Sequence, residues 1–360
     1  MKANSPYERI VKKLNKLAIA APDSKKFIEY LKLYIPKKDA EIVAELDNFT
    51  GRTKSARSIA KSINKSVDET KKILKRLVDE GKVLYINGRY ALHTIIDIFD
   101  IPLMVPKEEY KDKKIKKLAR LSEDFFKNKW NKEIFASERP FLRVIPVEQS
   151  IDVANQKVTN AEEISSRLKR AETIVKTTCP CRARKEILGE RKCDYPLESC
   201  LMLDFHGNAM AELGKGKVIS QEEAMDWINE ATRMGLVHMV ENCDEGPYFF
   251  VCSCCPCCCI GLRGLLELGN PRAVAPSNYI AVVDEDQCTG CEFCLEKCHF
   301  NAISMVDNKA RIDPDKCMGC SICSVSCPFI EMKRIDRERT PKNLLSLYGE
   351  IAKEKGRSIF

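Results

Sequence analysis

Apolar residues recur at helical spacing along the first part of the chain. Residues 6–34 place Ile10, Leu14 and Leu17, and later Phe27 and Leu31, three or four positions apart. This period predicts a helix whose apolar face is buried. The N-terminal segment 1–35 is therefore expected to be helical.

Residues 36–105 combine helical segments with a short segment of strands. Helical spacing continues over 40–49 and 55–63, and Ser66 to Glu69 is typical of a capping box that opens a third helix. Gly81 ends that helix, and two short apolar runs then flank the turn Asn87-Gly88. An Asn-Gly turn between such runs predicts a β-hairpin.

Three helices followed by a hairpin resemble a winged helix-turn-helix domain. The resemblance implies DNA binding through the third helix, at its N-terminal end. Asp68 and Glu69 stand at that end and would repel phosphates, whereas Lys71 and Lys72 partly offset them. A domain of this kind used only for packing or protein contact is the alternative.

Composition and charge divide the chain into two parts. Residues 1–140 contain 32 basic and 20 acidic residues, whereas the whole chain of 360 residues has a net charge of +8. All 19 cysteines lie after residue 140. Residues 106–150, which hold the basic run Lys111–Arg120, are expected to be a basic helical linker, and a basic front half would suit nucleic acid or an acidic protein partner.

Several classes of protein are excluded or disfavoured. No stretch approaches 18 uncharged apolar residues, which excludes a membrane span. Met1–Arg9 has no signal-peptide pattern, so a cytoplasmic protein is expected, in which cysteines serve as metal ligands or redox groups rather than disulfides. The sequence shows no dinucleotide fingerprint, P-loop or flavin motif, which disfavours a self-contained nucleotide-dependent enzyme.

The strongest motif is a repeated cysteine run in residues 276–335. Each copy has three cysteines at intervals of three and a fourth after a gap of four, and the second copy continues into Pro328. This run resembles the bacterial ferredoxin with two 4Fe-4S clusters. The resemblance implies one cluster on Cys288, Cys291, Cys294 and Cys327, and a second on Cys317, Cys320, Cys323 and Cys298.

Three further residues of this run are expected to lie beside the clusters. Gly290 and Gly319 would let backbone amides approach the cluster sulfurs. His299 stands where the first copy would have proline. It could place a titratable group beside a cluster, or simply replace proline at the surface.

Ten upstream cysteines predict further metal binding in residues 151–275. Free thiols packed so densely would oxidise, and adjacent cysteines such as Cys254 and Cys255 point apart along an extended chain, so they would serve different metal centres. One or more additional iron–sulfur clusters are expected. A structural zinc ion at the first four cysteines is the alternative. The ten are Cys179, Cys181, Cys193, Cys200, Cys252, Cys254, Cys255, Cys257, Cys258 and Cys259, whereas Cys243 is expected to be a plain buried thiol.

The order of these pieces resembles a family of dicluster-ferredoxin proteins of anaerobic prokaryotes. The resemblance rests on Cys179-Pro-Cys181-Arg182, on the Cys252–Cys259 block, on residues 193–200 and on Gly235-Leu236-Val237-His238. It covers most of residues 36–335 and implies electron carriage by 4Fe-4S clusters. It implies no substrate.

The sequence thus predicts an α+β multidomain protein. A helical, winged-helix-like N-terminal half would precede a cysteine-rich α+β middle, a C-terminal two-cluster ferredoxin fold, and a basic helix or tail over 336–360. The expected function is transfer of single electrons to or from a partner oxidoreductase of unknown identity. The alternatives are a redox-responsive winged-helix regulator and a catalytic or scaffold subunit of an oxidoreductase; nucleic acid is the less favoured partner.

Overall fold

A computed structural model describes residues 5–48, 53–151, 162–335, 337, 339–357 and 359. The chain divides into two compact units. Unit 1 comprises residues 1–137, 180–191 and 348–360, and unit 2 comprises residues 138–179 and 192–347. The structure is therefore mixed α+β, as expected.

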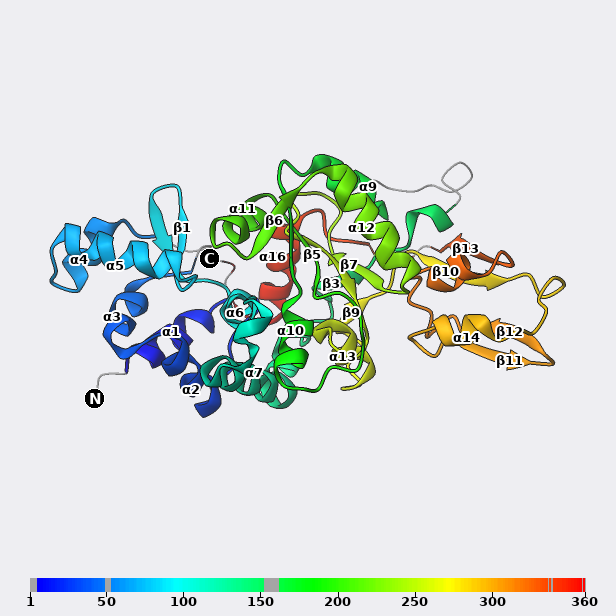
Figure 1. Cartoon of the computed structure of the whole chain (residues 1–360), viewed down its shortest axis with the longest axis horizontal. Coiled ribbons are helices and arrows are strands. Elements are labelled where there is room, and N and C mark those ends of the chain that lie inside the picture. The colour runs from blue at the N-terminus through cyan, green and yellow to red at the C-terminus, as the bar shows by residue number, and fades with distance from the viewer. Residues whose placement is uncertain are drawn as a thin grey trace. The chain divides into compact units, whose positions relative to one another are not determined.

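Unit 1 is mainly helical (Figure 1). The segment expected to be helical, residues 6–34, contains two helices with an irregular segment between them. Its elements are α1 (Pro6–Leu14), α2 (Lys25–Tyr34), α3 (Lys37–Glu45), α4 (Ala56–Ser62), α5 (Val67–Asp79), β1 (Leu84–Ile86), β2 (Arg89–Ala91), α6 (Ile95–Asp100), the 3-10 turns Ile101–Leu103 and Lys107–Lys111, α7 (Lys113–Phe125), the π turn Phe126–Trp130, α8 (Asn131–Ile134) and α10 (Pro180–Ile187).

The three helices and the hairpin of residues 37–91 appear in the expected order. Ser66 caps α5 by accepting a hydrogen bond from the Glu69 amide, and Asn87 and Gly88 form the hairpin turn with positive φ. The expected end of the first helix, at Phe49, lies outside the described residues. Basic side chains of α5 are engaged, because Lys75 pairs with Asp79 at 2.9 Å and Arg76 pairs with Asp39 and Glu80.

An aromatic cluster joins the segment expected to be a linker to the N-terminal helices. Phe125 stacks on Phe27 with ring centroids 5.1 Å apart, and Trp130 lies 5.2 Å from Phe99. Because α7 packs against α2, residues 106–137 belong to the core of unit 1 rather than to a linker.

The C-terminal segment folds back onto unit 1. Helix α16 (Leu344–Glu354) begins in unit 2 and ends in unit 1. Beyond it, the ammonium group of Lys355 donates to the carbonyl oxygens of Ala18 and Glu133 at 3.1 and 2.6 Å. The tail is thereby held by hydrogen bonds to residues distant in the sequence.

Unit 2 is built on a seven-stranded sheet in the order β6-β4-β5-β8-β7-β3-β9. The pairs are antiparallel except β3 with β9. Helix α11 lies along β4, β5 and β6, and α12 contacts α9, β4 and β5 (Figure 1). These elements are β3 (Leu142–Val144), the 3-10 turn Glu148–Ser150, α9 (Ile164–Arg170), β4 (Ile174–Thr178), β5 (Glu198–Leu203), α11 (Asp204–Glu212), β6 (Gly216–Ile219), α12 (Gln221–Arg233), β7 (Val237–Glu241), β8 (Phe250–Cys254), α13 (Ile260–Leu266) and β9 (Val274–Ala275).

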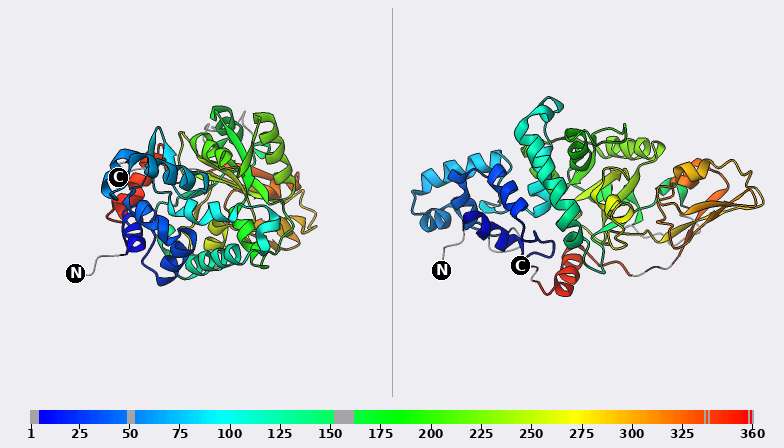
Figure 2. Two further views of the ribbon diagram at one scale, coloured as in Figure 1. Left: turned by 60° about the vertical axis from the view of Figure 1, so that its left-hand side comes forward. Right: turned by 90° about the horizontal axis from the view of Figure 1, so that it is seen from below.

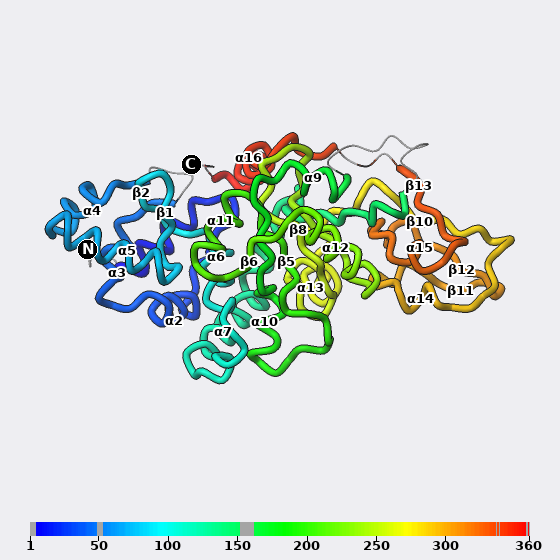
Figure 3. The backbone as a smooth tube through the Cα atoms, turned by 45° about the horizontal axis from the view of Figure 1, so that its top comes forward, coloured from blue at the N-terminus to red at the C-terminus, as the bar shows by residue number. Residues whose placement is uncertain are grey.

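The repeated cysteine run forms a small two-hairpin segment within unit 2. Two two-stranded sheets pair β10 (Tyr279–Val283) with β13 (Ile330–Arg334) and β11 (Ile303–Val306) with β12 (Lys309–Ile312). The helices α14 (Phe293–Lys297) and α15 (Ile322–Ser326) contact each other (Figure 3), and the strands are the yellow-to-orange ribbons of Figure 2. This segment is consistent with a ferredoxin-like domain.

Within the described ranges, none of the helices combines the length and apolar character that crossing a bilayer demands.

Candidate metal centres

The two cysteine runs adopt the same backbone conformation. Gly290 and Gly319 have φ values of +72° and +64°, and two residues later Glu292 and Ser321 are both at +62°. Each left-handed residue starts a short helix that carries the third cysteine of its run. The sequence repeat is therefore also a structural repeat.

Both glycines are required by close packing. A β-carbon on Gly290 would lie 2.5 Å from the carbonyl oxygen of Asn308, and one on Gly319 would lie 2.2 Å from that of Tyr279. Positive φ and lack of space both favour glycine. The amide of Gly290 also hydrogen-bonds the sulfur of Cys288, which matches the role expected for this glycine.

The first cysteine set lines one cavity. Cys288, Cys291, Cys294 and Cys327 all border it, so the last cysteine of the second run joins the first three of the first run. The amide of Ala310 donates to the sulfur of Cys288 at 3.4 Å. Backbone hydrogen bonds from Ala310 and Gly290 lower the pKa of the Cys288 thiol. They favour the thiolate that an iron–sulfur cluster needs.

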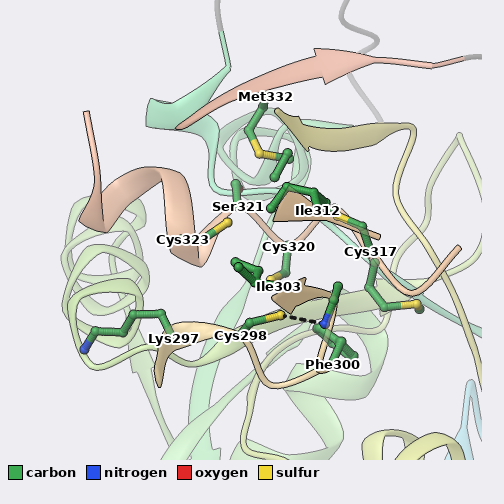
Figure 4. A pocket seen from close by; sticks show the side chains of 14 residues that line it. Lys297, Cys298, Phe300, Ile303, Ile312, Cys317, Cys320, Ser321, Cys323 and Met332 are labelled. Carbon is green, nitrogen blue, oxygen red and sulfur yellow. Dashed lines mark hydrogen bonds between the residues drawn. The ribbon is translucent and has the colours of Figure 1, made fainter. Parts of the chain in front are cut away.

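The second set lines a second cavity, and Figure 4 shows the sulfur atoms of Cys298, Cys320 and Cys323 directed into it. Cys317 also borders this cavity. The amide of Ala302 donates to the sulfur of Cys298 at 3.3 Å. Burial raises the pKa of Cys320 to about 12, so only a bound cation would keep this thiolate ionised at neutral pH.

The two cavities differ in exposure. Cys291 is exposed, whereas Cys317 and Cys323 are buried. At the second cavity, the hydroxyl of Ser321 accepts a hydrogen bond of 2.6 Å from the amide of Val147, which follows β3 of the large sheet. The first cavity is thus open to solvent, and the second is anchored to the body of unit 2.

His299 makes a second link to that body. Its Nε2 atom lies 2.8 Å from the carbonyl oxygen of Gly235, in the turn between α12 and β7. The ring therefore donates a hydrogen bond that proline could not make. This hydrogen bond gives His299 a structural contact, and its expected role as a titratable group beside the second cavity stays a prediction.

The upstream cysteines of unit 2 separate into two groups. The first, here called the sheet group, comprises Cys179, Cys200, Cys252, Cys254 and Cys259. Cys200 and Cys252 are partners in the β5–β8 register with sulfur atoms 3.8 Å apart, and Cys254 lies two residues further along the same face. Hydrogen bonding to neighbouring thiols, and burial, raise the pKa values of Cys200, Cys252 and Cys254.

The second group, here called the turn group, comprises Cys193, Cys255, Cys257 and Cys258. The four sulfur atoms all lie within 4.8 Å of one another. Cys193 comes from the irregular segment before β5, and the others come from the turn between β8 and α13. Hydrogen bonding to the neighbouring Cys255 raises the pKa of Cys257 to about 12, so the bare thiols cannot all ionise.

Neither group is the set of four upstream cysteines that the sequence offers as an alternative zinc site. Cys193 joins the later block rather than Cys179 and Cys200. Cys181 lies on α10, in unit 1. The expectation that Cys254 and Cys255 serve different centres agrees with their placement in different groups, because Cys254 ends β8 whereas Cys255 starts the turn.

Other candidate residues have structural partners. Arg184 donates to Ser122 and Asp100, and Lys185 pairs with Glu123 at 2.8 Å. The ring nitrogens of His238 lie 2.9 Å from the Thr232 hydroxyl and 3.2 Å from the Ser253 hydroxyl, and burial lowers its pKa to about 4. His238 is thus a buried neutral structural residue.

Sequence reasoning missed the partnership of Cys193 with the turn after β8. The two segments are separated by 62 residues along the chain, and no local spacing links them. Cys243 is buried, as expected, and burial raises its pKa to about 12.

Comparison with known proteins supports iron–sulfur binding by the segment that contains the two cysteine cavities. Residues 281–334 match the family model of the 4Fe-4S dicluster domain. This match covers the ferredoxin-like segment and all eight of its cysteines. No curated protein and no solved structure matches the chain.

Proposed function

We propose that this protein transfers single electrons through two 4Fe-4S clusters to or from a partner oxidoreductase. The observation that carries the proposal is the exchange of fourth ligands: each cavity takes three cysteines from one run and one from the other. This exchange is the ligand pattern of two-cluster bacterial ferredoxins.

The residues around both cavities fit the clusters. Each cavity presents four thiols, and each has a backbone amide that donates to a cysteine sulfur, from Ala310 to Cys288 and from Ala302 to Cys298. When bound, a 4Fe-4S cluster supplies one-electron redox chemistry whose potential depends on burial and on hydrogen bonds to sulfur. The protein's own contribution is to hold the thiolates and donate these hydrogen bonds.

The difference in exposure gives the two sites different roles. Cys291 is exposed and Phe293 is 46% exposed beside it, so a protein partner could approach the first site directly. At the second site none of the four cysteines is exposed, and the site is tied to the large sheet through Ser321 and Val147. The proposed exchange with the redox partner therefore takes place at the first site.

The sheet group supports a further iron–sulfur centre in the same unit. It offers five buried or half-buried thiols on the large sheet and its adjoining turn. Among the described residues, no three of its sulfur atoms share the close mutual spacing of the turn group.

Metal and sulfide analysis of anaerobically purified protein tests the proposal. We expect about eight irons and eight sulfides per chain from the two ferredoxin sites, with more if the sheet group is loaded. Cys294→Ala and Cys323→Ala should each remove about four irons, whereas Cys243→Ser, a buried thiol outside all four groups, should remove none. Retention of all iron in both alanine variants would contradict the assignment.

A further inference from the structure

We propose that Cys193, Cys255, Cys257 and Cys258 bind a single zinc ion as a tetrahedral tetrathiolate, rather than an iron–sulfur cluster. This inference goes beyond the electron-transfer proposal and is independent of it. It also assigns a ligand set that differs from the four cysteines at which zinc was considered from the sequence.

The spacing of the sulfur atoms carries the inference. A zinc–sulfur bond of about 2.3 Å places the four sulfurs of a tetrahedron about 3.8 Å apart. The Sγ atom of Cys193 lies 3.7 Å from that of Cys255 and 3.9 Å from that of Cys258, and the Cys257 and Cys258 sulfurs are 3.5 Å apart. The group therefore has the dimensions of one shared tetrahedral ion.

A group of four sulfurs that are all this close to one another is too compact to supply the four ligands of a 4Fe-4S cluster. In such a cluster each thiolate binds a different iron atom, so the thiolate sulfurs stand farther apart than ligands of one ion. The ferredoxin segment provides an internal comparison. Among the described residues, neither of its cysteine sets has sulfur atoms grouped within 4.8 Å of one another, whereas the turn group does.

The local backbone explains why the turn group is compact. The amides of Cys258 and Cys259 both point to the carbonyl oxygen of Cys255, at 3.4 and 3.2 Å, and this tight turn brings three sulfurs of one short segment together. Cys193 supplies the fourth ligand from a segment without regular structure. A bound ion would thus fasten the irregular segment before β5 to the turn after β8.

The ligand chemistry favours zinc. Four thiolates in a tetrahedron select zinc or iron–sulfur species among common metals. Two of the four side chains, Cys255 and Cys258, are buried, and no histidine or carboxylate joins them within the same spacing in the described part of the chain. A closed set of four ligands leaves no position for substrate, which is typical of a structural zinc site.

The test uses the full chain purified anaerobically, with zinc and iron measured per chain and zinc K-edge X-ray absorption recorded. We expect about one zinc per chain with four sulfur neighbours at about 2.3 Å. The double variant Cys193→Ser/Cys257→Ser should lose the zinc and keep the ferredoxin iron, and the matched control Cys243→Ser should keep both.

Three results would overturn the inference: loss of about four irons and no zinc from the double variant, zinc retained at full occupancy in it, or a mononuclear ferric signal that the double variant lacks. If the double variant does not fold, the zinc X-ray absorption spectrum of the unmodified protein still tests whether the zinc has four sulfur neighbours. Fewer than four sulfur neighbours around zinc, or no bound zinc, contradicts the site. None of these results alters the ferredoxin clusters, so failure here is distinguishable from failure of the electron-transfer proposal.

Discussion

Gly319 illustrates how the shape of the second cysteine cavity depends on a single backbone position. An alanine β-carbon at this position would lie 2.1 Å from the Ser277 hydroxyl oxygen and 2.2 Å from the Tyr279 carbonyl oxygen. Gly269 has nearly the same φ, +66°, but open space around it. Comparing substitutions at the two glycines therefore distinguishes the destabilisation caused by a left-handed backbone from that caused by steric overlap.

We expect Gly319→Ala to destabilise the protein more than Gly269→Ala. The control should lose about 1–2 kcal/mol from the left-handed conformation, whereas Gly319→Ala should lose about 1–3 kcal/mol more through overpacking. Iron per chain and the thermal midpoint are the measurements. Equal midpoints and full iron in both variants would show that the contact with Tyr279 is not needed.

Glu241 is a buried carboxyl group at the end of β7. Its Oε1 atom accepts hydrogen bonds from the amides of Phe249 and Phe250 at 2.7 and 3.2 Å, and burial raises its pKa to about 7 although Arg167 opposes the shift. Because the folded pKa exceeds the unfolded value of about 4.3, folding favours the protonated form.

The contribution of this group should therefore be greatest below about pH 4 and decline as the pH rises through 7. Relative to Glu241→Gln, the unmodified protein should lose about 3 kcal/mol of stability across this range. Denaturant unfolding of both proteins at several pH values measures the difference. Parallel stability profiles would mean that Glu241 is already ionised in the folded protein.

At the scale of elements, the link between α14 and the α12–β7 turn depends on His299. We expect His299→Ala to cost about 1 kcal/mol, because it removes the hydrogen bond to Gly235. His299→Gln retains an N–H donor and should restore part of the loss. Hydrogen exchange of the amides near Gly235 reports the change, and identical exchange in all three proteins would exclude a linking role.

The elements that the sequence predicted are those with strong local signals. The hairpin at Asn87-Gly88 and helix α5, which begins at the Ser66 cap, follow from turn and cap chemistry between neighbouring residues. The repeated ferredoxin run likewise brings the first three cysteines of each copy to one cavity through local spacing, whereas the fourth of each copy lines the other cavity.

The large sheet could not be predicted in this way. Strand β7 is buried at all five positions, and β5 is buried at all but one, so neither shows the alternation that identifies a half-buried strand. The apolar period of residues 6–34 predicts helical structure but does not locate the irregular segment between α1 and α2. The grouping of Cys193 with Cys255 depends on this sheet, and its signal is therefore long-range.

Across the whole chain, the C-terminal segment is bound to residues of unit 1 that are distant in the sequence. The carboxylate of Glu133 forms ion pairs with Lys355, at 3.1 Å, and with Arg357. Burial alone would raise the pKa of Glu133, but hydrogen bonds and charges from Arg357 and Lys355 lower it overall. Its stabilising contribution is therefore present at neutral pH and is lost as the pH falls through its lowered pKa.

We expect Glu133→Gln to destabilise unit 1 by about 2–4 kcal/mol at pH 7, because Lys355 is left buried without its carboxylate. Glu138→Gln is the control, since Glu138 is 78% exposed in its ion pair with Arg272 and should change stability by less than about 1 kcal/mol. Thermal unfolding compares the two. A loss in Glu133→Gln no larger than in the control would show that the tail is not held by this carboxylate.

We propose that the two cysteine cavities carry separate one-electron centres. Redox titration of the anaerobic protein, followed by electron paramagnetic resonance, measures this. We expect signals of two reduced 4Fe-4S clusters, with Cys294→Ala removing one and Cys323→Ala the other. A protein that binds no reducible iron at these eight cysteines, or whose signals survive both substitutions, would contradict it.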